Sequence, residues 1–423
     1  FRIDVTAAKD LLTTLEGKID ELASEIHADF PPLPVHVGTY HPPITKMGGH
    51  HTGRMGFMKE FYGFSYFGEP YSAIKWEEFN LSSPSQVVAR LEGHWKPVEF
   101  TPKGQPKCSD KNIESILNTA PPSIKNIKLY RMYTSRANDV ASWIKGAEKH
   151  DDKRLRGRII HIGSWSGRAS HSDPNTANIP SVVLRKSGAV KLPVTGEEGA
   201  FGYECRKLWV ADGNNVLLGC DASGIQLRIL AHYLNNPTYT AAVLDKPHDF
   251  NAKTLGCTRD EAKTFIYSWL LGAGVIKTAE ILNCSVGEAQ IARERFVRLT
   301  PGLAKFLGRK TLYADRGWYS GLDGRKVYLP SDHLALTAFL QNGEHVIMAV
   351  ANMFWDMWAK KKEIPFRQVN YVHDEWETET EPQYAERLKL LQEQSFVAAG
   401  KYLNLNCPLA GEGHIGKTWA EVH

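Results

Sequence analysis

The stretch NNVLLGCDASGIQLRILAHYL, Asn214 to Leu234, carries the change from strand to helix that decides the fold. Val216, Leu217 and Leu218 form a short apolar run, which predicts a buried strand at 215–220. Asp221 stands at the end of that run, and Gln226 follows near the start of an apolar, helix-like segment. A carboxylate at the end of a buried strand can serve a turn, a cap or a metal ion.

A second carboxylate stands in a similar place much later in the chain. The segment FRQVNYVHDEWETE, residues 366–379, reads as two strands that fold back at His373 and Asp374. Taken alone, a hairpin-tip aspartate is most simply a turn residue. Asp221 changes that interpretation, because one sheet could bring the two strand-end aspartates side by side. Two Mg²⁺ ions held between them could activate an attacking oxygen and stabilise a leaving one.

A helix with cations on one face is predicted between these strands. In TRDEAKTFIYSWLLGAG, residues 258–274, Thr258 and Glu261 form a capping box and the glycines are natural stops. Side chains four positions apart share one face, and here they are Arg259, Lys263, Tyr267 and Leu271. Two cations near a helix N-terminus favour a polyphosphate, and the tyrosine can stack on a base or sugar. A solvated cationic face with a core tyrosine explains the pattern equally well.

Other polar side chains are suited to contacts with nucleic acid. The loop GSWSGRASHSDPNTANIPS, residues 163–181, is long, lacks apolar anchors and contains Arg168, a donor for phosphate or sugar. An ordinary loop is the alternative. Gln341 interrupts an otherwise apolar helix, and a minor-groove contact and a solvent-facing side chain fit it equally well. Arg206 and His373 are of the same kind, and a lone His beside an Asp is more often structural than catalytic.

Composition sets only broad limits. The chain has 423 residues, 42% apolar and 23% charged, which is ordinary for a soluble enzyme of several folding units. Its net charge of +4 permits a nucleic-acid partner without showing one. No apolar run approaches the ~18–20 residues of a membrane span. Six scattered cysteines without a CxxC pair argue against structural zinc and for a reducing compartment. The first residue, Phe1, suggests a fragment or processed product.

The remaining pattern predicts a mixture of helices and short strands. Asp4 and the spacing of apolar residues favour an amphipathic helix over 5–29, stopped by prolines. The Gly- and His-rich stretch 38–70 is expected to be a loop-rich insert, and His50-His51 within it a surface loop rather than a metal site. Other expected elements are helices at 123–145, 225–315, 334–360 and 383–403, and strands at 157–165 and 215–220.

The order of these segments resembles that of the family A DNA polymerases. The matching motifs, in chain order, are SGRASHSDPNTANIP, DASGIQLRILAH, RDEAKTFIY followed by GAG, GLDGRKVYLP and VHDE. They lie between about Tyr130 and His423, and DASG, AKTFIY and EGHIGKTWAEVH most resemble replicative polymerases of short-tailed bacteriophages. The resemblance implies an α+β right-hand polymerase fold with an antiparallel-sheet palm, helical fingers and a helical thumb. Its implied boundaries are thumb 1–155 with the insert at about 38–70, palm 156–232 and 333–423, and fingers 233–332.

The resemblance also implies roles for individual residues. Asp221 and Asp374 match the two metal-binding and catalytic aspartates, with the Ala222 carbonyl as a further ligand. Arg259 and Lys263 match the triphosphate-binding pair of the fingers. Tyr267 matches the aromatic residue against the incoming sugar and base, and His248 matches a histidine near the β-phosphate. The matches at the primer–template are Arg206, Gln341 and His373 in the minor groove and Arg168 on the duplex backbone. Glu375 matches an acid beside the metal site, and the resemblance leaves its role open.

The implied reaction is template-directed addition of dNTPs to the 3′ end of a primer. The primer 3′-oxygen would attack the α-phosphate in line, with two Mg²⁺ ions, or Mn²⁺ in their place. Base pairing would choose the nucleotide, so binding to primer–template DNA should be salt-sensitive and largely independent of sequence. The resemblance implies phage genome replication in the cytoplasm of a bacterial host, away from membranes.

Four positions depart from the family pattern: Gln226 replaces Glu, Leu271 replaces Tyr, Thr337 replaces Asn, and Lys246 replaces an acid. We expect the first two to meet beside the nucleotide sugar, where Leu271 can neither donate nor accept the usual hydrogen bond. Gln is close to Glu in size, so the steric block to a 2′-hydroxyl, and with it the preference for dNTPs over rNTPs, should persist. Nucleotide choice is therefore where this chain should differ most from its relatives.

Two other functions fit parts of the pattern. A single-subunit RNA polymerase shares the arrangement of Asp, Arg-Lys and His-Asp, but Gln226 and AKTFIY argue against it. A catalytically idle DNA-binding protein would not need both aspartates and both cations, and a two-metal nuclease would not need the cationic helix. The usual exonuclease domain would lie before Phe1 and is not expected in this chain. The 38–70 insert falls where a relative carries a processivity-factor-binding insert, but it contains no matching motif.

Overall fold

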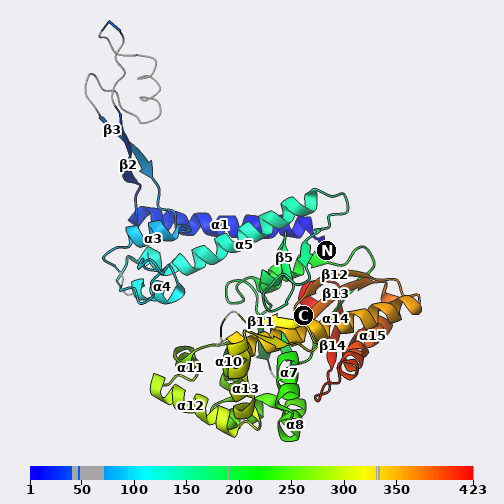
Figure 1. Ribbon diagram of the computed structural model, residues 1–423. Helices are drawn as coiled ribbons and strands as arrows, with labels where there is room; N and C mark the ends of the chain where they lie inside the picture. Colours follow the sequence, from blue (N-terminus) through cyan, green and yellow to red (C-terminus); the bar gives the residue numbers. More distant parts are fainter. Residues whose placement is uncertain are drawn as a thin grey trace. The chain divides into compact units, whose positions relative to one another are not determined.

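The computed structural model describes residues 1–40, 46–47, 71–94, 96–117, 119–187, 190–329, 331 and 334–422. Contacts divide the chain into a larger unit, Phe1–Ala8 with Ser142–His423, and a smaller unit, Lys9–Ala141. Helices α1 (Val5–Asp29) and α5 (Ile127–Glu148) each run through both units (Figure 1). The predicted thumb, 1–155, thus takes in the whole smaller unit and two short stretches of the larger one.

The main sheet of the larger unit joins strands from distant parts of the chain. Its order is β12-β13-β9-β14, and every neighbouring pair is antiparallel. The hairpin that folds back at residues 373–374 is confirmed. Strand β9 continues two residues past the expected end, so Asp221 lies within it, opposite Glu375 of β13 and Glu412 of β14. The strands are β9 (Val216–Ala222), β12 (Arg367–Val372), β13 (Glu375–Thr380) and β14 (Gly411–Gly416).

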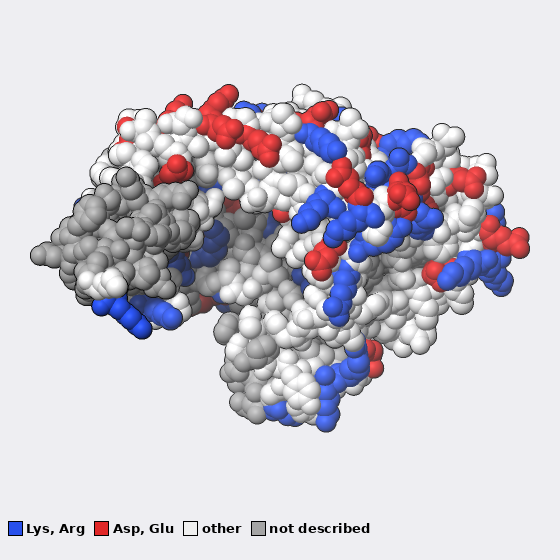
Figure 2. All heavy atoms as spheres, turned by 90° about the horizontal axis from the view of Figure 1, so that it is seen from above, with Lys and Arg blue, Asp and Glu red and all other residues white. Residues whose placement is uncertain are grey.

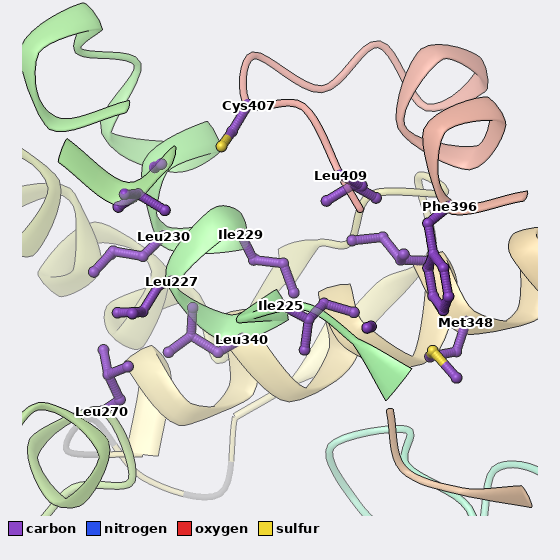
Figure 3. Packing of buried hydrophobic residues seen from close by; sticks show 14 of the residues in the cluster. Ile225, Leu227, Ile229, Leu230, Leu270, Leu340, Met348, Phe396, Cys407 and Leu409 are labelled. Carbon is purple, nitrogen blue, oxygen red and sulfur yellow. The ribbon is translucent and has the colours of Figure 1, made fainter. Parts of the chain in front are cut away.

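Two long helices cover one face of this sheet and build the core. Helix α15 (Pro382–Tyr402) packs on β9 and β14, and α14 (Ala335–Lys361) packs on α15 and on α7 (Ile225–Leu234). The Trp376 ring of β13 stacks on Phe396 of α15, with ring centres 5.1 Å apart and planes at 2°. Figure 3 shows how α7 fits into this core, through Ile225, Leu227, Ile229 and Leu230 beside Leu340 and Met348 of α14 and Phe396 and Leu409.

The opposite face of the sheet carries acidic side chains that alternate with the core residues. Glu379 of β13 is buried and bonds to Arg154 at 2.8 Å. Trp209 and Trp419 pack beside each other on this side, and the Trp419 indole donates to Glu375 at 3.5 Å. The short elements that form this layer are β1 (Arg2–Ile3), α6 (Gly202–Lys207), β8 (Trp209–Val210) and α16 (Trp419–Val422).

A run of helices follows α7, which confirms the helices predicted over 225–315. Gly272, with φ of 87°, ends the α10 segment as expected. The turn-rich patch after these helices forms a short hairpin that the sequence pattern did not indicate. The elements are α8 (Pro237–Asp245), α9 (Pro247–Leu255), α10 (Arg259–Leu270), α11 (Val275–Ile281), α12 (Val286–Leu299), α13 (Leu303–Arg316), β10 (Trp318–Ser320) and β11 (Lys326–Tyr328).

The expected strand at 157–165 is wrong beyond Ile160. Only β4 (Arg158–Ile160) forms, because the chain folds back on itself at Gly163, whose N–H bonds to the Arg168 carbonyl at 3.1 Å. The returning chain pairs with β4 as β5 (Ser170–Ser172). The loop then continues through η2 (Thr176–Asn178) into the hairpin of β6 (Leu184–Ser187) and β7 (Val190–Pro193).

The smaller unit is a helical body with a two-stranded ribbon. Helix α1 matches the predicted range 5–29, and α5 with η1 (Pro122–Asn126) matches the helix predicted at 123–145. The ribbon was not predicted; Pro34 is tolerated there because a two-stranded ribbon leaves one edge of each strand unpaired. The predicted insert at 38–70 is described only at 38–40 and 46–47, so His50-His51 lie outside the described residues. The other elements are β2 (Leu33–Tyr40), β3 (Tyr71–Glu77), α3 (Pro84–Arg90) and α4 (Asp110–Ile116).

Charge is mixed over the surface. Figure 2 shows Lys and Arg side chains next to Asp and Glu side chains on the face it displays, in keeping with a net charge of only +4. Among the described residues, no helix combines the length and apolar character needed to cross a bilayer.

Candidate active site

The two predicted aspartates lie at the same end of the main sheet. Asp221 is the last residue but one of β9, and Asp374 lies in the turn between β12 and β13. His373, beside it, adopts a left-handed conformation with φ of 52° that turns the hairpin. The Ala222 N–H donates to the Asp374 carbonyl at 2.9 Å and ties the turn to β9. The fold therefore joins two carboxylates that are far apart in the sequence, as predicted.

The surrounding protein does not neutralise these carboxylates. Desolvation raises the pKa of Asp221, and the negative charge of Asp374 raises it further. Desolvation also raises the pKa of Asp374, and the charge of Glu344 adds to that effect more than Arg168 offsets it. Asp221 is exposed to solvent and Asp374 is half-buried, so both residues remain accessible from solution. A cation from solution could therefore supply the missing positive charge.

The donor set fits a hard divalent cation. Mg²⁺ is commonly bound by one or two carboxylates, with water and substrate phosphate completing its ligands. Among the described residues, no three His, Cys, Asp or Glu side chains gather in a metal-binding arrangement. Protein ligands at this end of the sheet would thus be the two aspartates, with backbone oxygens such as that of Ala222 as additional candidates.

Helix α10 presents the predicted cations to solvent. The capping box is present: the Glu261 N–H donates to the Thr258 hydroxyl, and the Glu261 carboxylate accepts from the Thr258 N–H at 2.8 Å. Arg259 and Lys263 lie exposed in the first two turns. Arg259 forms long contacts with Asp249, at 3.4 Å, and with Asp260. Exposed pairs of this kind contribute little to stability, so the guanidinium remains available to an anion.

His248 and Tyr267 connect the cationic helix to the sheet. Their ring centres are 5.9 Å apart. Burial lowers the pKa of His248, and the charges of Arg259 and Lys263 lower it further. Burial raises the pKa of Tyr267, and the charges of Asp374 and Asp221 raise it further. Residues from α9 and α10 and the two aspartates of the sheet thus share one electrostatic environment.

A buried hydrogen-bond network lies beside the aspartates. Arg168 donates to the Glu344 carboxylate at 2.6 Å, and Gln226 donates to the same oxygen at 3.2 Å. Glu344 is fully buried in α14. The predicted residues Arg168 and Gln226 are therefore joined through an acid that the sequence interpretation did not include.

Comparison with known proteins supports one family. The family model described as DNA polymerase family A matches residues 67–421, most of the chain. The chain belongs to DNA polymerase family A. Curated relatives include the DNA-directed DNA polymerases of Enterobacteria phage T3 and Escherichia phage T7, each 29% identical over 84% of this chain and 54% of the relative. That of Escherichia phage Phieco32 is 34% identical over 63% of this chain and 50% of the relative. The chain thus spans about half the length of these relatives.

The fold of this family A chain agrees with a solved structure of the family. The structure described as the POL domain of Pol1 from M. smegmatis in complex with DNA primer-template and dNTP superposes with a TM-score of 0.76. The match covers 100% of this chain and 67% of the other, at 20% sequence identity. Together with the antiparallel main sheet and its helical surroundings, it confirms the predicted α+β right-hand polymerase fold.

Three further predicted positions, Leu271 at the nucleotide and Thr337 and Gln341 at the primer–template, differ in their surroundings. Leu271 caps the end of α10 and is half-exposed, and its expected contact with Gln226 stays a prediction. Thr337 is buried, and its hydroxyl donates to the Leu270 carbonyl at 3.0 Å, so it holds α14 against α10. Gln341, one turn later in α14, is half-buried.

Arg206 and Glu375 lie beneath the sheet rather than on an open surface. Arg206 is 7% exposed, donates to the Pro180 carbonyl at 2.9 Å and stacks its guanidinium on Trp419 at 4.4 Å. Glu375 is 5% exposed and accepts from the Trp419 indole. In this structure both side chains face protein. A contact of Arg206 with DNA would need it to leave this packing, and it stays a prediction.

His373 is set apart from an ordinary surface histidine. Burial lowers its pKa to about 4, and the charges of Arg168 and His171 contribute. Its ring lies 6.2 Å from that of His171. The imidazole is therefore neutral near pH 7, so one ring nitrogen can donate and the other can accept a hydrogen bond.

Sequence reasoning missed two buried acids that shape this region. Glu344 lies three residues after Gln341 in an apolar helix, and the only signal was a charged residue at a core-facing position. Glu377 is fully buried between Glu375 and Glu379 on β13. The alternation of Glu375, Glu377 and Glu379 carries no signal of burial in the sequence, and only the packing of the layer beneath the sheet shows that these side chains are buried.

Proposed function

We propose that this chain is the polymerase part of a DNA-directed DNA polymerase, which extends a primer 3′ end with dNTPs. The observation that carries the proposal is the convergence of Asp221 and Asp374 beside the cationic helix α10, with Tyr267 in the field of both carboxylates. Family membership and the phage relatives support the same activity. We further propose a role in phage genome replication in the cytoplasm of a bacterial host, which the similarity to phage polymerases supports.

The subdomains follow the family arrangement in this proposal. Residues 1–155 form the thumb, 156–232 with 333–423 form the palm around the main sheet, and 233–332 form the helical fingers. Primer–template DNA and dNTPs are the partners. A processivity factor bound at the 38–70 insert would be a further partner, and deletion of that insert with a processivity assay tests it.

Asp221 and Asp374, with the Ala222 carbonyl, would hold two divalent cations, Mg²⁺ or Mn²⁺. Such cations, when bound, lower the pKa of the primer hydroxyl and offset charge on the phosphates. Arg259 and Lys263 neutralise the triphosphate and the departing pyrophosphate, and they do so from the end of a helix whose dipole adds to their charge. His248, whose pKa is lowered by burial and then by these two cations, would donate a hydrogen bond to a phosphate oxygen.

The other side chains orient the substrates. Tyr267 offers a flat face to the base and sugar of the incoming nucleotide. Gln226, near the start of α7, fills the space beside the sugar. Arg168, Gln341 and His373 face the primer–template minor groove and backbone, where contacts fix register without reading sequence. Arg206 and Thr337 would contact the primer–template next to these residues, Leu271 would lie beside Gln226 at the sugar, and Glu375 supports this surface from behind.

Primer extension tests the proposal directly. The protein, a primed template, dNTPs and Mg²⁺ should give template-dependent products. Asp374→Ala should abolish them, because one of two carboxylates for the cation is gone. Asp356→Ala is the matched control: its carboxylate pairs with Lys360 on the surface of α14, and extension should be unchanged. Near wild-type extension by Asp374→Ala would contradict the proposal. Competition between dNTPs and rNTPs in the same assay separates it from an RNA polymerase.

A further inference from the structure

One buried carboxylate joins three elements beside the candidate site. Glu344 of α14 has no solvent exposure. A single oxygen, Oε2, accepts from Arg168 of the loop before β5 at 2.6 Å and from the Gln226 amide of α7 at 3.2 Å. Arg168 is largely buried as well, with 17% of its side chain exposed. A buried pair of this kind is costly to break, because removing one partner leaves the other charge unpaired.

The network fixes the orientation of the Gln226 amide. An ionised carboxylate can only accept hydrogen bonds, so the amide must turn its nitrogen to Glu344. Its oxygen then points away from Glu344 and can accept a hydrogen bond elsewhere. A glutamate at 226 would have no donor to offer, and it would place a second carboxylate against Glu344. Gln226 and Glu344 are therefore complementary, and the cluster has room for one negative charge.

Part of the network is left for a ligand. The Arg168 Nε–H and the Glu344 Oε1 are buried and have no hydrogen-bond partner among the described residues. Buried polar atoms of this kind are normally bonded, so these two positions point to a missing partner. Glu344 also influences Asp374 and Asp221 electrostatically, which places the network next to both carboxylates.

We propose that Glu344 is a positioning residue for substrate selection. Its carboxylate binds both the Gln226 amide and the Arg168 guanidinium and so fixes their positions relative to each other. The cluster accommodates one carboxylate, either at position 226 or at position 344, but not one at each position. Gln226 then presents its amide oxygen beside the nucleotide sugar, while the bond to Glu344 holds the Arg168 guanidinium in place next to it. This inference rests on the proposed function.

A charge-swap cycle tests the proposal. Wild type, Gln226→Glu, Glu344→Gln and the double variant Gln226→Glu/Glu344→Gln are compared in steady-state primer extension. Each single variant should raise the KM for dNTP about tenfold, a size typical of coupled neighbours. Gln226→Glu does so by repulsion, and Glu344→Gln does so by leaving Arg168 unpaired. The double variant should return KM to within about threefold of wild type, because the carboxylate has only moved between neighbouring side chains.

Two readouts separate positioning from general stability. The ratio of rNTP to dNTP incorporation should rise in both single variants and recover in the double variant, which a merely destabilised protein would not show. Glu386→Gln, an exposed Glu-to-Gln change on α15, is the matched control and should leave KM and the ratio unchanged. If a single variant does not fold, recovery of a folded protein in the double variant, with an unfolding midpoint close to that of wild type, gives the same comparison; a double variant that also fails to fold overturns the proposal.

The outcomes are distinguishable. Additive effects, in which the double variant is as impaired as the two single variants combined, overturn the proposal. Singles that match wild type in KM and in nucleotide ratio overturn it as well. Failure of the wild-type protein to extend any primer would instead contradict the proposed polymerase function, while the unfolding midpoints would still report on the pairing of Gln226 with Glu344.

Discussion

Acidic side chains at two places on the main sheet have opposite surroundings. Asp221 and Asp374, at the end of the sheet, repel each other, and their pKa values are raised by desolvation and by neighbouring acids. Glu379, five residues further along β13, is buried more deeply but is paired with Arg154 at 2.8 and 3.0 Å. The difference teaches that burial alone does not identify a functional acid. A pair of carboxylates that no Lys or Arg side chain neutralises is the better indication of a functional site.

The largest expected effect is a loss of activity without a loss of stability when Asp221 is replaced. Asp221→Asn should lower primer extension by at least ~10³, because half of the carboxylate pair for the cation is lost. Its unfolding midpoint should not fall, since a repulsive contact has been removed. Extension assays and thermal unfolding on the same preparation measure both. A loss of stability that matches the loss of activity would show that Asp221 is structural.

The second prediction is the opposite result, a loss of stability with little loss of activity, when Glu379 is replaced. Glu379→Gln should lower the free energy of unfolding by as much as about 3 kcal/mol, because Arg154 loses its buried carboxylate partner and keeps only its pairing with Asp212 at 3.2 Å. Activity per folded molecule should stay close to wild type. Denaturant unfolding measures the first quantity and active-site titration the second. Replacement of both partners, Arg154→Met with Glu379→Leu, is the control and should recover much of the stability; no recovery would mean that packing rather than charge is responsible.

The third prediction concerns pH. The folded-state pKa values of Asp221 and Asp374 are raised above the ordinary value near 4, so the folded state binds more protons than the unfolded state. Without divalent cations, stability should therefore fall as pH rises from the ordinary value through the raised values. Mg²⁺ should restore it, most strongly at high pH. Unfolding midpoints at pH 6 and 8.5, with and without Mg²⁺, should show shifts of about 2–4 °C.

Asp374→Asn provides the control for this pH effect. With one carboxylate gone, both the fall with pH and the Mg²⁺-dependent recovery should shrink. Equal pH dependence in wild type and variant would assign the effect to other groups, such as Glu377, whose pKa is also raised by burial.

The smallest expected effect concerns the N-terminal caps of two helices, α10, which carries Arg259 and Lys263, and α12. Thr258 caps α10 and Ser285 caps α12 through the same kind of capping box. Thr258→Ala and Ser285→Ala should each cost about 1 kcal/mol of stability. Thr258→Ala should also raise the KM for dNTP, because fraying of the first turn moves Arg259, whereas Ser285→Ala should not. Equal KM values in both variants would contradict a triphosphate site at this helix.

Much of the site could be predicted because its chemistry leaves local marks. Asp221 ends an apolar run, Asp374 occupies a hairpin tip, and the capping box before Arg259 fixes the helix start; each signal lies within a few residues. Glu344 left no such mark, since a single acid in an apolar helix gains its meaning only from Arg168 and Gln226, which come from other elements. Arg206 was expected at a DNA surface, and its burial under Trp419 depends on the same kind of distant packing.

Strand β14 shows why part of the fold could not be predicted. Its sequence, GEGHIG, has neither apolar alternation nor β-branched residues beyond Ile415. The glycines are needed because a side chain would not fit: a Cβ at Gly411 would lie 2.3 Å from the Phe396 ring, and one at Gly413 would lie 2.8 Å from the Lys389 side chain. Close approach of α15, not strand propensity, selects this sequence.

The position of β14 has a consequence for how the protein is made. Because β9 lies between β13 and β14, the strand that carries Asp221 keeps an open edge until residues 411–416 have been synthesised. An open edge in a partly made chain is a site for pairing with other chains. During translation, both aspartates are made before the strand that completes the sheet. The last-made strand therefore decides when the carboxylates become a binding site, and until then the exposed edge of β9 is a point of vulnerability to aggregation.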